Sequence, residues 1–141
     1  MRSVVLDASA ALAWLLPSQA TEAAGAFLDE GDTTFFEAPA IFEWEVHNVL
    51  MGMTRRGLVT EEQYETALGD YRRLDMRLHS PGMAIEELAA LARGLRLSLF
   101  DASYFALALD RDWPLASRDE ALLTVTMAAG LECFDLRATN A

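Results

Sequence analysis

The stretch Ser3–Leu16, SVVLDASAALAWLL, joins a short apolar run to a series of small residues through a single aspartate. Its first part, Val4–Leu6, is continuous and β-branched, which predicts a strand buried on both faces, as in a parallel sheet. Ser9 is a suitable N-cap for a helix that Pro17 ends after about two turns. Asp7 is therefore expected at the carboxyl end of a strand, the edge at which open parallel sheets bind ligands.

The rest of the chain alternates between helical and strand patterns with short connections. Helices are expected over residues 21–30, 39–56, 60–78, 84–93, 98–110 and 118–130, and further strands over 33–39, 113–117 and 131–136. This alternation indicates an α/β fold around a parallel sheet, and the length fits a single domain over residues 1–141.

Two of the expected helices form a hairpin from Pro39 to Leu78, because no strand pattern separates them. Pro39 suits the first turn of a helix, and Gly57 suits the position after its end. Thr60 and Gln63 have the spacing of a capping box for the second helix. We expect this hairpin to project from the sheet as a unit.

The composition favours a protein whose partner is a cation or a metal ion. The chain has 22 acidic residues against 11 arginines and no lysine, and its net charge is −11. Nucleic-acid-binding proteins usually carry a basic surface, so contact with nucleic acid would need local arginine clusters and a neutralising metal.

No apolar run approaches the ~20 residues of a membrane span, and no signal-peptide pattern is present. The single cysteine, Cys133, excludes an internal disulfide and a multi-cysteine zinc site, and is expected to be a buried strand residue. A reducing, cytoplasmic setting is therefore expected.

Glu45 lies on the flank of the apolar stripe of the 39–56 helix, and Asn48 lies on the same side. An unpaired charge at such a position costs several kcal/mol unless something compensates it. Spacing alone equally allows Glu45 to be a partly solvated edge residue. Glu43 and His47 lie on the opposite side and are expected to be ordinary surface residues.

Two further aspartates follow serines at predicted helix starts. Ser98 with Asp101, and Ser117 with Glu120, have the spacing of capping pairs, while Asp119 lies in a first helical turn that favours negative charge. Each aspartate, like Asp7 with Ser9, therefore has an ordinary capping explanation.

Taken together, Asp7, Asp101 and Asp119 all lie at helix starts, which a parallel sheet brings to one edge. Converging there with Glu45, they would raise one another's pKa values unless a cation lay among them. Oxygen ligands without histidine or cysteine suit Mg²⁺ or Mn²⁺, which can activate water and stabilise charge on a phosphoryl oxygen.

Several other enzyme classes are excluded. His47 and His79 fit no metal-ligand spacing, and the chain has no nucleophile elbow, phosphate-binding glycine loop or zinc motif. A haloacid-dehalogenase-type phosphatase needs an aspartate where Ser9 stands, and a response-regulator receiver needs a lysine near the site.

Four segments together resemble the PIN-domain ribonucleases, particularly the VapC toxins of bacterial toxin–antitoxin pairs. They are VVLDASAALAWLL (4–16), APAIFEWEVHNVL (38–50), LSLFDASYFALAL (97–109) and PLASRDEALLTVTMAAGLECF (114–134). The resemblance covers nearly the whole chain and implies a three-layer α/β/α sandwich with a central twisted parallel sheet.

The resemblance also implies the site residues. The metal-binding and catalytic acids would be Asp7, Glu45, Asp101 and Asp119, supported by Ser9, Asn48 and Ser117. Ser117 stands where the family more commonly has threonine, which keeps the hydroxyl group.

In function, the resemblance implies a Mg²⁺- or Mn²⁺-dependent endoribonuclease that forms a homodimer. It further implies a cognate antitoxin bound over the hairpin of residues 39–78, often with a basic residue reaching into the acidic site. The alternative is a non-catalytic α/β binding module of PIN-like fold, which would not need a metal ion.

Two surfaces of the hairpin are candidates for binding. Arg55, Arg56, Arg72 and Arg73, with Arg77, would give a positive rim for RNA phosphates; the alternative is that they pair with Glu61, Glu62, Asp70 and Asp75 on solvated helix faces. Trp44, Met51, Met53, Tyr64, Tyr71 and Met76 would line a groove for an amphipathic partner segment. The alternative is that these six side chains pack against the sheet or a dimer mate.

Overall fold

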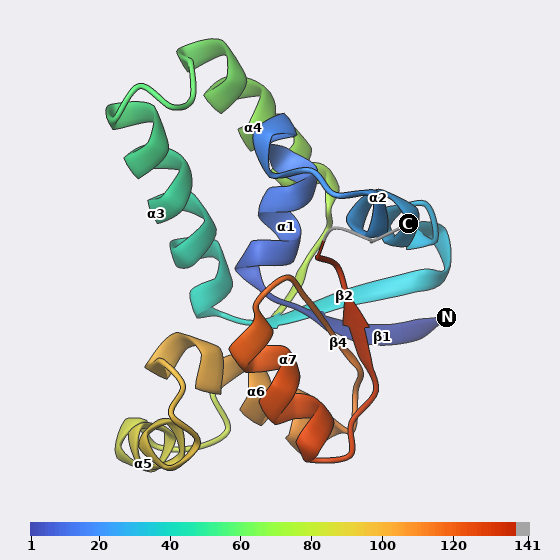
Figure 1. Cartoon of the computed structure of the whole chain (residues 1–141), viewed down its shortest axis with the longest axis vertical. Coiled ribbons are helices and arrows are strands. Elements are labelled where there is room, and N and C mark those ends of the chain that lie inside the picture. Colours follow the sequence, from blue (N-terminus) through green and yellow to red (C-terminus); the bar gives the residue numbers. More distant parts are fainter. Residues whose placement is uncertain (138–141) are drawn as a thin grey trace.

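Five parallel strands form one sheet through the centre of the computed structural model, which describes residues 1–137 (Figure 1). The strands are β1 (Arg2–Leu6), β2 (Thr34–Pro39), β3 (Arg77–His79), β4 (Leu115–Ser117) and β5 (Cys133–Asp135). Their order across the sheet is β3-β2-β1-β4-β5, and every neighbouring pair is parallel. The predicted α/β architecture is confirmed.

Helices cover both faces of the sheet, which gives the three layers expected (Figure 1). They are α1 (Ala8–Leu15), α2 (Glu22–Leu28), α3 (Ile41–Arg55), α4 (Glu61–Arg73), α5 (Ile85–Leu95), α6 (Leu99–Arg111) and α7 (Glu120–Ala128), with short 3₁₀ turns η1 (Pro17–Gln19) and η2 (Gly31–Thr33). Helices α1 to α4 pack together on one face, and α5 to α7 on the other. Within residues 1–137, no helix has the length and apolar character needed to cross a membrane.

Strand β1 is central, as its sequence predicts. Val4, Val5 and Leu6 have no exposed surface, and β1 pairs with β2 on one side and with β4 on the other. Burial on both faces explains why its apolar residues run continuously instead of alternating. The chain leaves β1 directly into Asp7 and then α1.

The predicted N-caps of α1 and α7 are both wrong, because in each case an aspartate takes the place of the expected serine. Asp7, rather than Ser9, is the N-cap of α1, since its side chain accepts a hydrogen bond from the Ala10 N–H. Asp119, rather than Ser117, is the N-cap of α7 and accepts from the Leu122 N–H. In both cases the aspartate occupies the last extended position before the helix, so the neighbouring serine hydroxyl is free for other partners.

The hairpin is shorter than expected, because Pro39 belongs to the predicted strand and not to the helix, and because the expected helix over 60–78 ends before a strand at its far end. Pro39 is the last residue of β2, opposite His79 of β3, and α3 begins at Ile41. At the other end α4 stops at Arg73, and the chain turns through Asp75 (φ 51°) into the edge strand. The hairpin therefore spans residues 41–73, and the capping box at Thr60 is confirmed.

Two smaller expectations are corrected. Gly94 lies inside α5, which closes at Arg96 in the left-handed region (φ 57°). Cys133 lies in a strand as predicted, but β5 is an edge strand and the side chain is only half-buried.

Candidate active site

Asp7 lies at the carboxyl end of the central strand, where only 3% of its surface is exposed. Its Oδ1 accepts hydrogen bonds from the Ala10 N–H (3.0 Å) and the Ser9 hydroxyl (2.8 Å). Its Oδ2 accepts from the Ser117 hydroxyl at 2.7 Å, across from β4. Both carboxylate oxygens are thus fixed by groups from two strand–helix junctions.

Burial raises the pKa of Asp7 from its ordinary value of 3.8 to about 7. The hydrogen bonds from Ser117, Ala10 and Ser9 lower the pKa but do not offset burial, and the charge of Asp101 raises it further. A nearby cation would favour the ionised form of this carboxyl group. Within residues 1–137, no basic side chain forms an ion pair with Asp7.

Glu45 is fixed from the opposite layer of the molecule. The buried hydroxyl of Tyr104, on α6, donates a 2.7 Å hydrogen bond to Glu45 Oε1, on α3. Burial raises the pKa of Glu45, and the charges of Asp101 and Asp119 add to that rise. Tyr104 was missed in the sequence, although it stands three residues after Asp101 and therefore on the same side of its helix.

Asp101 and Asp119 complete the acidic cluster. Asp101 lies in the first turn of α6, where its N–H donates to the Ser98 hydroxyl; burial and the charge of Asp119 raise its pKa. The N–H of Asp119 donates to the Ser117 hydroxyl at 2.9 Å. The electrostatic effects among these carboxylates show that four separate elements direct them to one region.

The supporting residues divide into two groups. Ser9 and Ser117 contact Asp7 directly, and their hydroxyl oxygens lie 3.4 Å apart. Asn48 is exposed on α3, one turn after Glu45, and makes no side-chain hydrogen bond within residues 1–137. The described structure therefore ties the serines, but not Asn48, to the acids.

The donor set fits Mg²⁺ or Mn²⁺. Its donors are carboxylate oxygens, which these hard cations prefer, and neighbouring negative charges raise the pKa values of Asp7, Glu45 and Asp101, an effect that a cation would oppose. In the part of the chain that the structure describes, no three acidic, histidine or cysteine side chains already form a complete ligand group.

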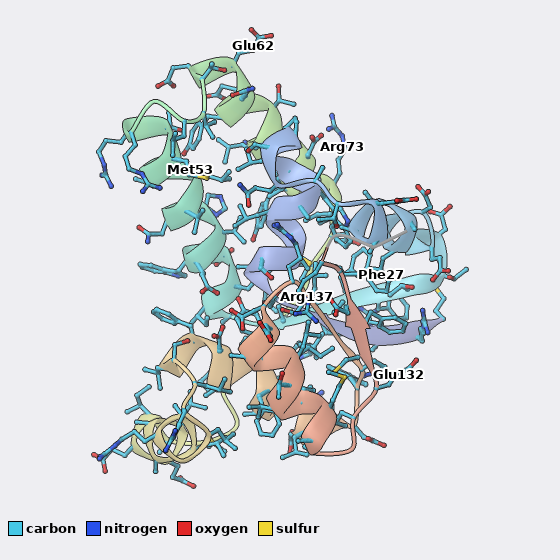
Figure 2. All side chains as sticks on the ribbon, viewed as in Figure 1. Phe27, Met53, Glu62, Arg73, Glu132 and Arg137 are labelled. Carbon is cyan, nitrogen blue, oxygen red and sulfur yellow. The ribbon has the colours of Figure 1, made fainter. Side chains whose placement is uncertain are left out.

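The candidate arginines do not form one rim. Because α3 and α4 run in opposite directions, Arg55 and Arg56 lie at the tip of the hairpin. Figure 2 shows Glu62 near that tip and Arg73 at the other end of α4. Arg73 also pairs with Asp70 at 2.7 Å.

Arg77 lies on the edge strand β3, where it lines one pocket together with Arg73. It packs over the Phe35 ring and faces buried Glu37, with an N–O distance of 3.6 Å. Its contacts are therefore those of a residue that covers the edge of the sheet.

The apolar residues of the hairpin are split between surface and core. Trp44 and Met51 are exposed, 78% and 53% respectively. Met53, Tyr64, Tyr71 and Met76 are half-buried and pack against the main core. The His47 ring lies edge-on to the Tyr71 ring, with 4.8 Å between the ring centroids, so His47 is not the ordinary surface residue expected.

A family model for the PIN domain matches residues 4–126. The fold is similar to the crystal structure of PAE2754 from Pyrobaculum aerophilum, at 19% identity and a TM-score of 0.68, covering 94% of this chain and 91% of that one. It is also similar to FitAcB from Neisseria gonorrhoeae (18% identity, TM-score 0.57, 94% and 96% covered). A third similar structure is FitAB bound to an IR36 DNA fragment (17% identity, TM-score 0.58, 98% of each chain). A search of curated proteins finds no match.

Proposed function

The chain belongs to the PIN domain family, whose members are typically metal-dependent nucleases, and from that premise we propose that it is a Mg²⁺- or Mn²⁺-dependent endoribonuclease. The observation that carries the proposal is the buried carboxyl group of Asp7 at the carboxyl edge of the sheet, whose pKa burial raises and the charge of Asp101 raises further. A binding module would gain nothing from keeping such a group ionised.

In this proposal Asp7 and Asp101 are the main metal ligands, with Glu45 and Asp119 as direct or water-mediated ligands. The chemistry supplied at this position would be activation of water and neutralisation of charge on the scissile phosphate. Ser9 and Ser117 hold Asp7 in place, and Tyr104 holds Glu45. These hydrogen bonds fix the two carboxylates before any ion or substrate binds, which lowers the cost of ordering them.

Metal dependence is the direct test. Purified protein incubated with single-stranded RNA is expected to cleave it with Mg²⁺ or Mn²⁺ and to lose cleavage in excess EDTA, with recovery when the metal is restored. Gel analysis of a 5′-labelled RNA measures this. RNA binding without cleavage under every metal condition would favour the alternative of a non-catalytic binding module.

We further propose that the chain is the toxin of a toxin–antitoxin pair, a homodimer that acts in the cytoplasm. The support is the resemblance to the VapC toxins, the exposed Trp44 and Met51 on the hairpin, and a net charge of −11 that suits a basic partner tail. FitAB, solved on an IR36 DNA fragment, is consistent with a partner that binds DNA.

Co-expression with the adjacent gene tests the partner. The chain is expected to elute with an antitoxin in size exclusion, and the antitoxin is expected to protect the hairpin from proteolysis, because Trp44 and Met51 would be covered. Trp44→Ala with Met51→Ala should weaken this complex, whereas Met127→Ala, at an exposed residue of α7, should not. A lone chain that is equally soluble, equally protected and harmless to its host would contradict the proposal.

The two arginine pairs remain candidates for RNA binding. Charge reversal of Arg55 and Arg56, or of Arg72 and Arg73, is expected to weaken RNA binding and to flatten its salt dependence. Because the pairs lie at opposite ends of the hairpin, the two effects should be independent. Fluorescence anisotropy across a salt series measures them, and an unchanged salt slope for both pairs would exclude both as phosphate contacts.

A further inference from the structure

Arg118 differs in its surroundings from every other basic residue of the chain. Of the eleven arginines, it alone is half-buried, while the other ten are exposed. It stands between Ser117, which binds Asp7, and Asp119, which belongs to the acidic cluster. A positive side chain thus lies in a strand–helix junction that already carries two residues of the candidate site, Ser117 and Asp119.

The backbone of Arg118 is fixed to the site. Its N–H donates a 2.9 Å hydrogen bond to the Ser9 hydroxyl oxygen, and the same hydroxyl donates to Asp7. The Cα position of Arg118 is therefore set by the network that holds the candidate metal ligand.

The guanidinium group of Arg118 contacts Gln19, which lies in η1. Its Nη1 donates to the side-chain oxygen of Gln19 at 3.3 Å. Within residues 1–137, no carboxylate lies within ion-pair distance of Arg118, although it has acidic neighbours in the sequence and in the fold. Gln19 is neutral, so it orients the group without cancelling its charge.

A guanidinium group has five N–H donors in a planar fork, which matches two oxygens of a phosphate. Among the residues that the structure describes, the Arg118 guanidinium makes one hydrogen bond, to Gln19, which leaves its other donors to a ligand. We propose that Arg118, oriented by Gln19, binds a backbone phosphate of the substrate RNA beside the acidic cluster. This inference rests on the proposed ribonuclease function and names a phosphate-binding position within it.

The alternative is that the contact between Arg118 and Gln19 only ties the β4–α7 junction to η1. The two explanations differ in what they predict for Gln19→Glu. That change gives Arg118 a carboxylate partner, which would keep or strengthen the tie but neutralise the cation. A structural role therefore predicts unchanged RNA binding, and a phosphate-binding role predicts weaker binding.

The test measures binding of a short 5′-fluorescein single-stranded RNA by anisotropy, with Mg²⁺ present and in an Asp101→Asn background that prevents cleavage. Arg118→Gln and Gln19→Glu are each expected to weaken binding about tenfold and to reduce the log–log salt slope by about 0.7, the value for one phosphate contact on a single strand. Arg118→Lys should keep part of the affinity. Arg93→Gln and Gln63→Glu, exposed residues with matched charge changes, should match the background protein.

Each result decides between the explanations. Unchanged affinity and slope for Gln19→Glu, with thermal stability kept, would overturn the proposal and leave Arg118 a structural role. Loss of affinity only for a co-expressed partner protein would also overturn it. If the two variants weaken RNA binding as expected but the wild-type chain cleaves no RNA, the phosphate position stands and the ribonuclease proposal fails. If the background protein binds no RNA, both fail.

Discussion

Asp101→Asn is expected to leave the protein folded and to lower its Mg²⁺-dependent RNA cleavage on the order of 10³-fold, as removal of a group that stabilises transition-state charge does. The fold should persist because Asp101 is half-exposed and its backbone N–H, not its side chain, makes the bond to Ser98. Asp7→Asn should have a similar effect on cleavage. The measurement is the initial rate on labelled RNA at saturating Mg²⁺, together with circular dichroism of each variant.

The matched control for Asp101→Asn is Asp110→Asn, which removes an exposed carboxylate from the other end of the same helix. It should cleave RNA at the wild-type rate, which separates loss of a ligand from a change in overall charge. A folded double variant, Asp7→Asn with Asp101→Asn, that retained full Mg²⁺-dependent cleavage would refute the assignment of these acids.

The parts of the fold that sequence could predict are those that depend on neighbouring residues. The consecutive β-branched residues Val4 and Val5 predict the buried β1 strand. The three-residue spacing between Thr60 and Gln63 predicts the capping box. Asp7, Asp101 and Asp119 could likewise be placed at helix starts from the residues next to them in the sequence. A parallel sheet brings such helix starts to one edge. The position of Glu45 beside an apolar stripe left its role open, and only the family resemblance assigned it to the site.

What sequence could not predict depends on contacts between distant segments. Tyr104 binds Glu45 across 59 positions, and Arg118 binds Gln19 across 99. Leu74 and Leu78 have helical spacing, yet Leu78 lies in a three-residue strand because pairing with β2 decides its conformation. Local propensity is a weak guide where tertiary pairing competes with it.

The caps show a limit of a different kind. Aspartate and serine are almost equally good N-caps, so a sequence that offers both does not say which one caps. The structure gives the cap to Asp7 and Asp119, and this choice turns Ser9 and Ser117 towards the Asp7 carboxylate. Which residue caps each helix therefore determines which side chains are left to bind the Asp7 carboxylate.

Because Asp7 is buried, its ionisation is expected to lower the stability of the metal-free protein as the pH rises, which is the opposite of the usual effect of a carboxyl group. Its pKa is about 7 in the folded state and 3.8 as the ordinary value, so between these limits the folded state holds a proton that the unfolded state has released. The contribution of Asp7 to stability is thus full below about pH 4 and is lost as the pH rises through 7, at about 1.4 kcal/mol per pH unit and a few kcal/mol in all.

Asp7→Asn removes this penalty, because asparagine stays neutral while its side-chain oxygen can still cap α1. In EDTA, the variant is therefore expected to be more stable than the wild type by about 2–4 kcal/mol at pH 8, and the difference should shrink to near zero at about pH 3.5. Urea unfolding of both proteins across this range measures it, and taking the difference cancels the other acids. Mg²⁺ at pH 8 should then stabilise the wild type more than the variant, since the cation favours the ionised carboxylate. A difference between the two proteins that did not change with pH would show that Asp7 ionises normally, and the reason for a compensating cation at this position would be lost.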